Sequence, residues 1–219
     1  MGLYAFFRQH RFFVLPLLLF WLLGIAVILL TEQWSLFRWL NQWHSPAADW
    51  FFKYFTHLGG RWVFPVGLLF SSFIKYRYLL GILTAGLLTL CLVLVLKKIV
   101  FKDTLRPTGW QQFTTEKIHQ VPGVENRKRY SFPSGHSIAG FAFWGFWALY
   151  SRRSYTKLIL WSVAFAVAYS RIYLLHHFLE DVVAGSMLGF GIAVIAYSYS
   201  RNGRSSWLDK RVTLKIPTE

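Results

Sequence analysis

Three short segments of the chain hold the polar side chains that could do chemistry. They are KKIVFKDTLRP at 97–107, PSGH at 133–136 and SRIYLLHHFLED at 170–181. His177 and Asp181 lie four residues apart, so on a helix they share one face and the carboxylate can accept a hydrogen bond from the imidazole. Ser134 and Gly135 open an apolar run, and the free backbone N–H groups at the start of a helix favour an anion. Together these features predict a site for an anionic group.

The elements that must position these segments are membrane helices. Of the 219 residues, 55% are hydrophobic and 15% are charged, and several apolar runs approach the roughly 20 residues needed to cross a bilayer. We expect an all-α, polytopic membrane helix bundle with a single domain, residues 1–219, and catalytic motifs within 97–181. The six expected transmembrane helices are Phe12–Leu30, Trp62–Ile74, Tyr78–Leu96, Ser137–Tyr150, Leu158–Leu175 and Val182–Tyr197. Between the first two, aromatic and charged residues at helical spacing predict amphipathic helices in the membrane interface.

The distribution of charge predicts the orientation of the bundle. The formal net charge is +15, but the cations are dispersed between spans rather than gathered on one soluble face. We therefore expect membrane lipids, and no nucleic acid, as partners. Closely spaced cations at 8–11, 75–77, 152–157 and 201–215 fall on one side, which we assign to the cytoplasm. Both termini would then be cytoplasmic in the plasma (inner) membrane, with the polar segments on the periplasmic or extracellular face.

The three polar segments, in this order and between these spans, resemble the motifs of the type 2 phosphatidic acid phosphatase family. The family pattern is Lys, six residues, Arg-Pro; then Pro-Ser-Gly-His; then Ser-Arg, five residues, His, three residues, Asp. The second part matches at 133–136. The third part matches at Ser170, Arg171, His177 and Asp181.

The first part of the pattern matches only in its second half. Arg106 and Pro107 are present, but Ile99 occupies the position of the family lysine. Lys98 fits with one extra residue and Lys97 with two. Because consecutive residues on a helix point about 100° apart, we expect only one of the two lysines to reach the site, and both remain candidates.

The resemblance implies a mechanism and a set of roles. His177 would attack phosphorus and form a phosphohistidine, with Asp181 fixing the tautomer of its ring. His136 would protonate the leaving oxygen and then activate the water that releases phosphate. The remaining candidates would bind the phosphate oxygens: Lys97 or Lys98, Arg106, Ser134, Gly135 and Arg171. We interpret His176 as structural, and we expect no metal and no cofactor because the cations can neutralise the phosphoryl group.

The leading hypothesis is an integral membrane phosphatase that removes phosphate from a lipid phosphate or diphosphate in the outer leaflet. By family analogy, undecaprenyl diphosphate is the favoured substrate, followed by phosphatidylglycerol phosphate, phosphatidic acid and lipid A phosphate. A phosphotransferase that passes the phosphoryl group to another lipid fits the same residues. A non-enzymatic lipid transporter would not need His136, His177 and Asp181, and the chain lacks the repeated halves typical of transporters. The sequence leaves the oligomeric state open.

Overall fold

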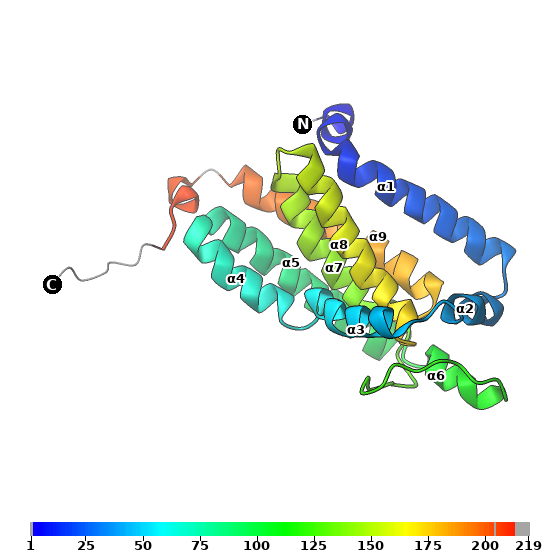
Figure 1. The fold of residues 1–219 in the computed structure, drawn as a ribbon. Helices are drawn as coiled ribbons and strands as arrows, with labels where there is room; N and C mark the ends of the chain where they lie inside the picture. The colour runs from blue at the N-terminus through cyan, green and yellow to red at the C-terminus, as the bar shows by residue number, and fades with distance from the viewer. Residues whose placement is uncertain (1, 204, 213–219) are drawn as a thin grey trace.

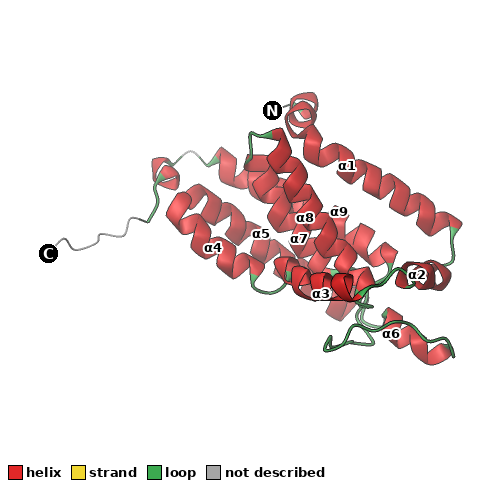
Figure 2. Cartoon of the chain, viewed as in Figure 1, coloured by secondary structure: helices red, strands yellow, loops and turns green. Residues whose placement is uncertain are grey.

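The computed structural model describes residues 2–203 and 205–212, and it consists of helices joined by loops (Figures 1 and 2). The long helices are α1 Leu3–Leu30, α4 Val63–Ile74, α5 Tyr76–Val95, α7 Gly135–Tyr150, α8 Ser154–Tyr173 and α9 Leu179–Asn202. The short helices are α2 Gln33–Asn41, α3 Pro46–Phe55 and α6 Pro107–Trp110, with single turns at η1 Thr56–Gly59, η2 Leu96–Val100, η3 Gln111–Phe113 and η4 Ser206–Asp209. The described residues contain no strand, so the all-α class is confirmed.

Each of the six expected spans coincides with one long helix, and the main difference is in α1. This helix begins at Leu3, nine residues before the expected start, because the basic segment around Arg8 and Arg11 continues the helix instead of preceding it. Three helical segments are long and apolar enough to cross a membrane: Leu3–Leu30, Tyr76–Val100 and Leu179–Asn202. The count of six spans stays a prediction.

Helix α7 forms the centre of the bundle and packs against α5, α8 and α9. Small residues allow α9 to approach closely. A Cβ atom added to Gly185 would lie 2.8 Å from the carbonyl oxygen of Ser134, and one added to Gly189 would lie 2.4 Å from that of Ile138. Such spacing of small residues lets two helix backbones meet, as in membrane helix pairs. The starts of α7 and α9 are therefore held together.

The outer faces of α1, α4 and α5 are apolar. Leu22, Leu69 and Leu94 are 68%, 65% and 50% exposed, which fits contact with lipid rather than water. The short helices have their own start signals: the Glu32 side chain caps α2, and the Ser45 side chain caps α3. The two helices expected between the first spans therefore exist, and their place in the membrane interface stays a prediction.

The two ends of the bundle differ in the segments that they carry. In Figure 1, α2, α3 and α6 gather at the end where α7 and α9 begin, together with the loop 101–134. The N-terminus, the α4–α5 turn and the α7–α8 turn lie towards the opposite end, where Arg77 donates to the carbonyl oxygens of Ser200 and Gly203 at the end of α9. The closely spaced cations therefore lie away from the polar segments; Arg204 and the positions from 213 onward lie outside the described residues.

Candidate active site

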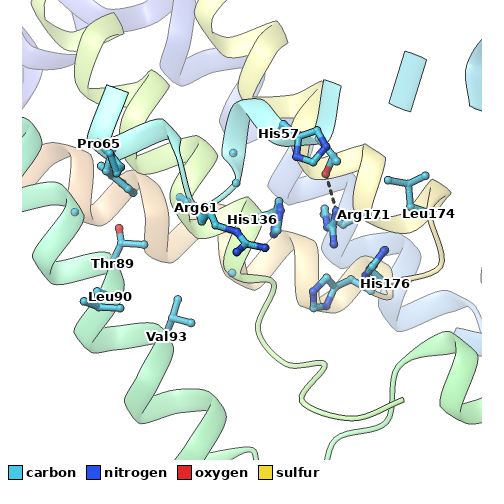
Figure 3. A pocket seen from close by; sticks show the side chains of 18 of the residues that line it. His57, Arg61, Pro65, Thr89, Leu90, Val93, His136, Arg171, Leu174 and His176 are labelled. Atoms are coloured by element: carbon cyan, nitrogen blue, oxygen red, sulfur yellow. Dashed lines mark hydrogen bonds between the residues drawn. The ribbon is translucent and has the colours of Figure 1, made fainter. Parts of the chain in front are cut away.

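All three polar segments contribute to one cavity of about 850 Å³ at the end of the bundle where α7 and α9 begin. The cavity has a polar end lined by Lys97, Arg106, His136, Arg171, His176 and His177. It continues along α4 and α5 past apolar side chains that include Pro65, Leu90 and Val93 (Figure 3). One cavity therefore joins a cationic cluster to an apolar trough.

His177 is oriented by Asp181, as the sequence predicted, although the contact has a different origin. Its Nδ1 lies 3.1 Å from Asp181 Oδ2. His177 lies in the turn before α9, which begins only at Leu179. Asp181 reaches back from the first turn of the helix, and the same oxygen accepts from the Phe178 backbone N–H at 3.0 Å, the contact that a carboxylate makes when it caps a helix. One carboxylate thus closes the start of α9 and fixes the ring of His177.

Ser131 completes this arrangement. Its Oγ donates to Asp181 Oδ2 at 2.5 Å. With Nδ1 of His177 directed at the carboxylate, Nε2 is the free nitrogen of a ring that lines the cavity. Burial, and then the neighbouring Lys97 and Arg106, lower the pKa of His177 well below its usual value. The ring is therefore neutral at pH 7, the form in which an imidazole can act as a nucleophile.

Arg106 is held in place by the loop and by His176. Its Nε donates to the carbonyl oxygen of Arg129 at 3.0 Å, and its Nη1 lies 3.1 Å from His176 Nδ1. Burial lowers the pKa of Arg106 to about 10, so the guanidinium remains charged at neutral pH. Burial and the nearby Arg171 lower the pKa of His176 to about 2, which keeps its ring neutral and able to accept this hydrogen bond.

The two candidate lysines point in different directions. Lys97 lines the cavity, and its Nζ donates to the carbonyl oxygens of Tyr130 at 2.6 Å and Ser131 at 2.9 Å. Lys98 lies over the ring of Tyr130, 4.8 Å from its centre, and is not part of the cavity wall. Residues Leu96–Val100 form a π turn, a wider turn that accommodates an inserted residue and is frequent at functional sites. This turn accommodates one of the two extra residues that separate Lys97 from Arg106.

Arg171 and Thr56 form a buried pair. Arg171 is 5% exposed, and its Nη1 donates to Thr56 Oγ1 at 2.6 Å (Figure 3). Its Nε is buried without a partner among the described residues. A buried guanidinium with an unused N–H group is suited to bind an anionic oxygen. Thr56 belongs to none of the motifs, so the sequence offered no signal for it.

In the PSGH segment, Ser134 caps helix α7, and Gly135 and His136 line the cavity. Ser134 is fully buried, and its Oγ caps α7 by accepting from the Ser137 backbone N–H at 3.3 Å. Gly135 and His136 line the cavity, whereas Ser134 does not. The structure thus gives Ser134 a capping contact where the sequence predicted a phosphate ligand.

Most of the expected site residues therefore meet in one place. The cavity wall contains His136, His177, Lys97, Arg106, Arg171 and Gly135, with Asp181 directly behind His177. The sequence reasoning missed Thr56 and Ser131, and it gave His176 a merely structural role. Within residues 2–203 and 205–212, no group of three or more His, Cys, Asp or Glu side chains could hold a metal ion.

Comparison with known proteins identifies the family. A family model described as the PAP2 superfamily matches residues 76–205, which is more than half of the chain and includes all three motifs. The chain belongs to the PAP2 superfamily. The resemblance that the motifs suggested is therefore confirmed, and the protein is a membrane lipid phosphatase of the PAP2 type.

Three similar proteins place the chain within the PAP2 superfamily. A lipid A 4'-phosphatase from Porphyromonas gingivalis is 30% identical over 82% of this chain and 78% of its own length. The crystal structure of LpxE from Aquifex aeolicus matches with a TM-score of 0.63 and 28% identity, covering 75% of this chain and 94% of that one. A transmembrane PAP2-type phosphatidylglycerolphosphate phosphatase from Bacillus subtilis matches with a TM-score of 0.63 and 23% identity, over 87% of this chain and 97% of that one, and this match supports the fold.

Proposed function

We propose that this protein hydrolyses a phosphate from a lipid head group through a phosphohistidine on His177, on the outer face of the plasma membrane. The observation that carries the proposal is the cavity that joins two unlike environments. Its polar end combines an imidazole backed by a carboxylate with three cations, and its other end is an apolar trough between α4 and α5. A phosphorylated lipid has the same division between head group and chain.

The reaction has two steps. Nε2 of His177 attacks phosphorus, the bond between phosphorus and the leaving oxygen breaks, and His136 gives that oxygen a proton. Water then attacks the phosphohistidine, His136 takes the proton of this water, and inorganic phosphate leaves with the ring of His177 restored. Lys97, Arg106 and Arg171 surround the equatorial oxygens and neutralise their charge in both steps.

The comparisons change the order of substrates to test. Because the Porphyromonas gingivalis relative is a lipid A 4'-phosphatase, we place lipid A phosphate first. Undecaprenyl diphosphate, which family analogy favoured, comes second and rests on that analogy alone.

A panel of substrates tests the proposal directly. Purified protein is incubated with lipid A, undecaprenyl diphosphate, phosphatidylglycerol phosphate and phosphatidic acid in detergent micelles, with and without EDTA. We expect phosphate release from at least one lipid, unaffected by the chelator, because protein cations supply the positive charge. Incorporation of oxygen from ¹⁸O-labelled water into the released phosphate distinguishes hydrolysis from transfer to another lipid. No release from any lipid, or release that needs added Mg²⁺, would refute the corresponding part of the proposal.

A further inference from the structure

A second group of basic side chains lines the same cavity, apart from the three cations Lys97, Arg106 and Arg171. This group, which we call the basic rim, consists of Lys53, His57, Arg61 and Arg127. Among the described residues of the cavity wall, Glu125 is the one acidic residue, against six Lys and Arg side chains. Three of these six serve the phosphoryl group in the proposed mechanism. The other three, Lys53, Arg61 and Arg127, carry more positive charge than the single carboxylate of Glu125 can neutralise.

The basic rim is not neutralised by the protein. Among the described residues, Arg61 forms no ion pair, and Arg127 has only Glu125 at 4.0 Å with both side chains largely exposed, a contact of little energetic value. Lys53 donates to the carbonyl oxygen of Pro122 at 2.7 Å, which is a neutral acceptor. Arg61 points into the cavity beside His136 (Figure 3). The rim therefore keeps positive charge available for a ligand.

The segment that carries His57 and Arg61 is fixed against Arg171 and His136. Thr56 binds Arg171, and the carbonyl oxygen of Leu58 accepts from the Trp144 indole at 2.9 Å. A Cβ atom added to Gly59 would lie 2.9 Å from the His136 carbonyl oxygen, and one added to Gly60 would lie 3.7 Å from His136 Nε2. The backbone between His57 and Arg61 thus lies directly against the proposed acid, which pre-organises the rim for binding.

The position of this segment beside His136 determines which part of the lipid head group it can contact. In an in-line displacement, the attacking and leaving oxygens or nitrogens lie on opposite sides of phosphorus. If His177 attacks and His136 protonates the leaving oxygen, the remainder of the lipid head group lies on the His136 side. The part of the basic rim that comes from the 57–61 segment, His57 and Arg61, lies against His136 and therefore on that side too.

We infer that the basic rim is a second anion subsite, which binds a further phosphate group carried on the leaving portion of the lipid. This inference rests on the proposed function, and it narrows the substrate class to lipids with at least two phosphate groups. Two kinds of lipid have this chemistry. A diphosphate places its second phosphate next to the leaving oxygen, and a doubly phosphorylated glycolipid places it farther away on the sugar.

Matched substrate pairs test the subsite. One pair is a prenyl diphosphate and the monophosphate of the same chain; the other is a disaccharide lipid with two phosphates and its singly phosphorylated form. The variants of the full-length protein are Arg61→Gln, Arg61→Lys and, as a control, Lys117→Gln, which removes an exposed cation outside the cavity. The measured quantity is kcat/KM for each substrate.

We expect Arg61→Gln to lower kcat/KM for the doubly phosphorylated member of one pair about 10- to 100-fold more than for its singly phosphorylated partner, the loss of one charge-assisted hydrogen bond. Arg61→Lys should keep part of the preference, and Lys117→Gln should keep all of it. The pair that shows the effect identifies which kind of lipid the rim fits. Equal losses for both members, or no loss, would overturn the subsite, whereas a wild-type protein inactive on all four lipids would instead refute the proposed function.

Discussion

At the scale of single residues, the site depends on groups that hold the reactive side chains in place. Oδ2 of Asp181 accepts from Ser131 and Phe178 and faces the ring of His177. The loop carbonyl oxygens of Tyr130 and Ser131 direct Lys97 towards the cavity. Because His177, Lys97 and Arg106 each have fixed partners, these groups need little reorganisation when the phosphate binds.

The two lysines should differ sharply in function. We expect Lys97→Ala to lower kcat/KM about 100-fold or more, because the proposed mechanism loses one of the cations that bind the phosphoryl oxygens. Lys98→Ala should lower it less than about threefold, because an exposed cation–π contact has little value. Steady-state assays on both variants measure the difference. Equal losses would mean that the side-chain directions seen here do not hold during turnover.

The acidic limb of the pH profile should lie unusually low. The proposed attack by His177 requires a neutral ring, and burial, together with Lys97 and Arg106, lowers the pKa of His177 below its ordinary value of about 6.5. As pH falls, kcat/KM should therefore decline only below pH 6.5, after correction for ionisation of the substrate. In Lys97→Met the remaining activity should decline at a higher pH, because one repelling cation is gone. An acidic limb above pH 6.5 in the wild-type protein would contradict this account of the ring.

At the scale of elements, the site is a product of how α7 and α9 meet. The first turn of α7 carries His136, and the first turn of α9 carries Asp181. Gly185 and Gly189 let the two helices approach until their backbones touch. A larger side chain at either glycine would have to displace a carbonyl oxygen of α7, which is part of the backbone and cannot rotate away.

Of two alanine substitutions in α9, one should destabilise the protein and the other should not. Gly189→Ala places a Cβ atom 2.4 Å from the Ile138 carbonyl oxygen, and such overpacking costs about 1–3 kcal/mol. Gly191→Ala is the matched control, because nothing lies within 4 Å of its Cβ position. We expect a lower unfolding temperature and lower kcat for Gly189→Ala, and no loss for Gly191→Ala. A Gly189→Ala protein with wild-type stability and activity would show that the helix contact does not position the site.

The sequence predicted the long helices, but it predicted few of the side-chain contacts within the site. Hydrophobic runs predicted the helices because a chain that crosses a bilayer must make its backbone hydrogen bonds within the segment. The predicted ends of α4 at Ile74 and of α7 at Tyr150 agree with the structure. Thr56 was missed because its partner, Arg171, is 115 positions away, a distance that no local pattern reports. The sequence placed Ser134 at the start of α7, but it did not show that the Ser134 hydroxyl turns to the Ser137 backbone N–H instead of the cavity.

At the scale of the whole molecule, the two ends of the bundle differ in the features that they carry. One end holds the cavity under the loop 101–134, and the other holds closely spaced cations such as Lys75 and Arg77, which pair with Asp209. The density of cations in short loops favours the cytoplasm for the second end. The cavity would then face the outside.

Cysteine labelling in intact cells tests this orientation. In a Cys91→Ser background, a cysteine replacing Glu125 should react with a thiol reagent that cannot cross the membrane. A cysteine replacing Arg152, in the turn between α7 and α8, should react only after the membrane is opened. The reverse pattern would move the site to the cytoplasm.

The measurement that tests the mechanism most directly is the location of phosphate trapped on the protein during turnover. The protein is quenched in base, which preserves phosphohistidine, and mapped by mass spectrometry. We predict phosphate on His177 in the wild-type protein and in Asp181→Asn, with turnover of Asp181→Asn lowered about 100- to 10,000-fold because the ring loses its orientation. We predict no trapped phosphate and no turnover in His177→Ala. Phosphate on His136 instead, or activity that survives in His177→Ala, would contradict the account.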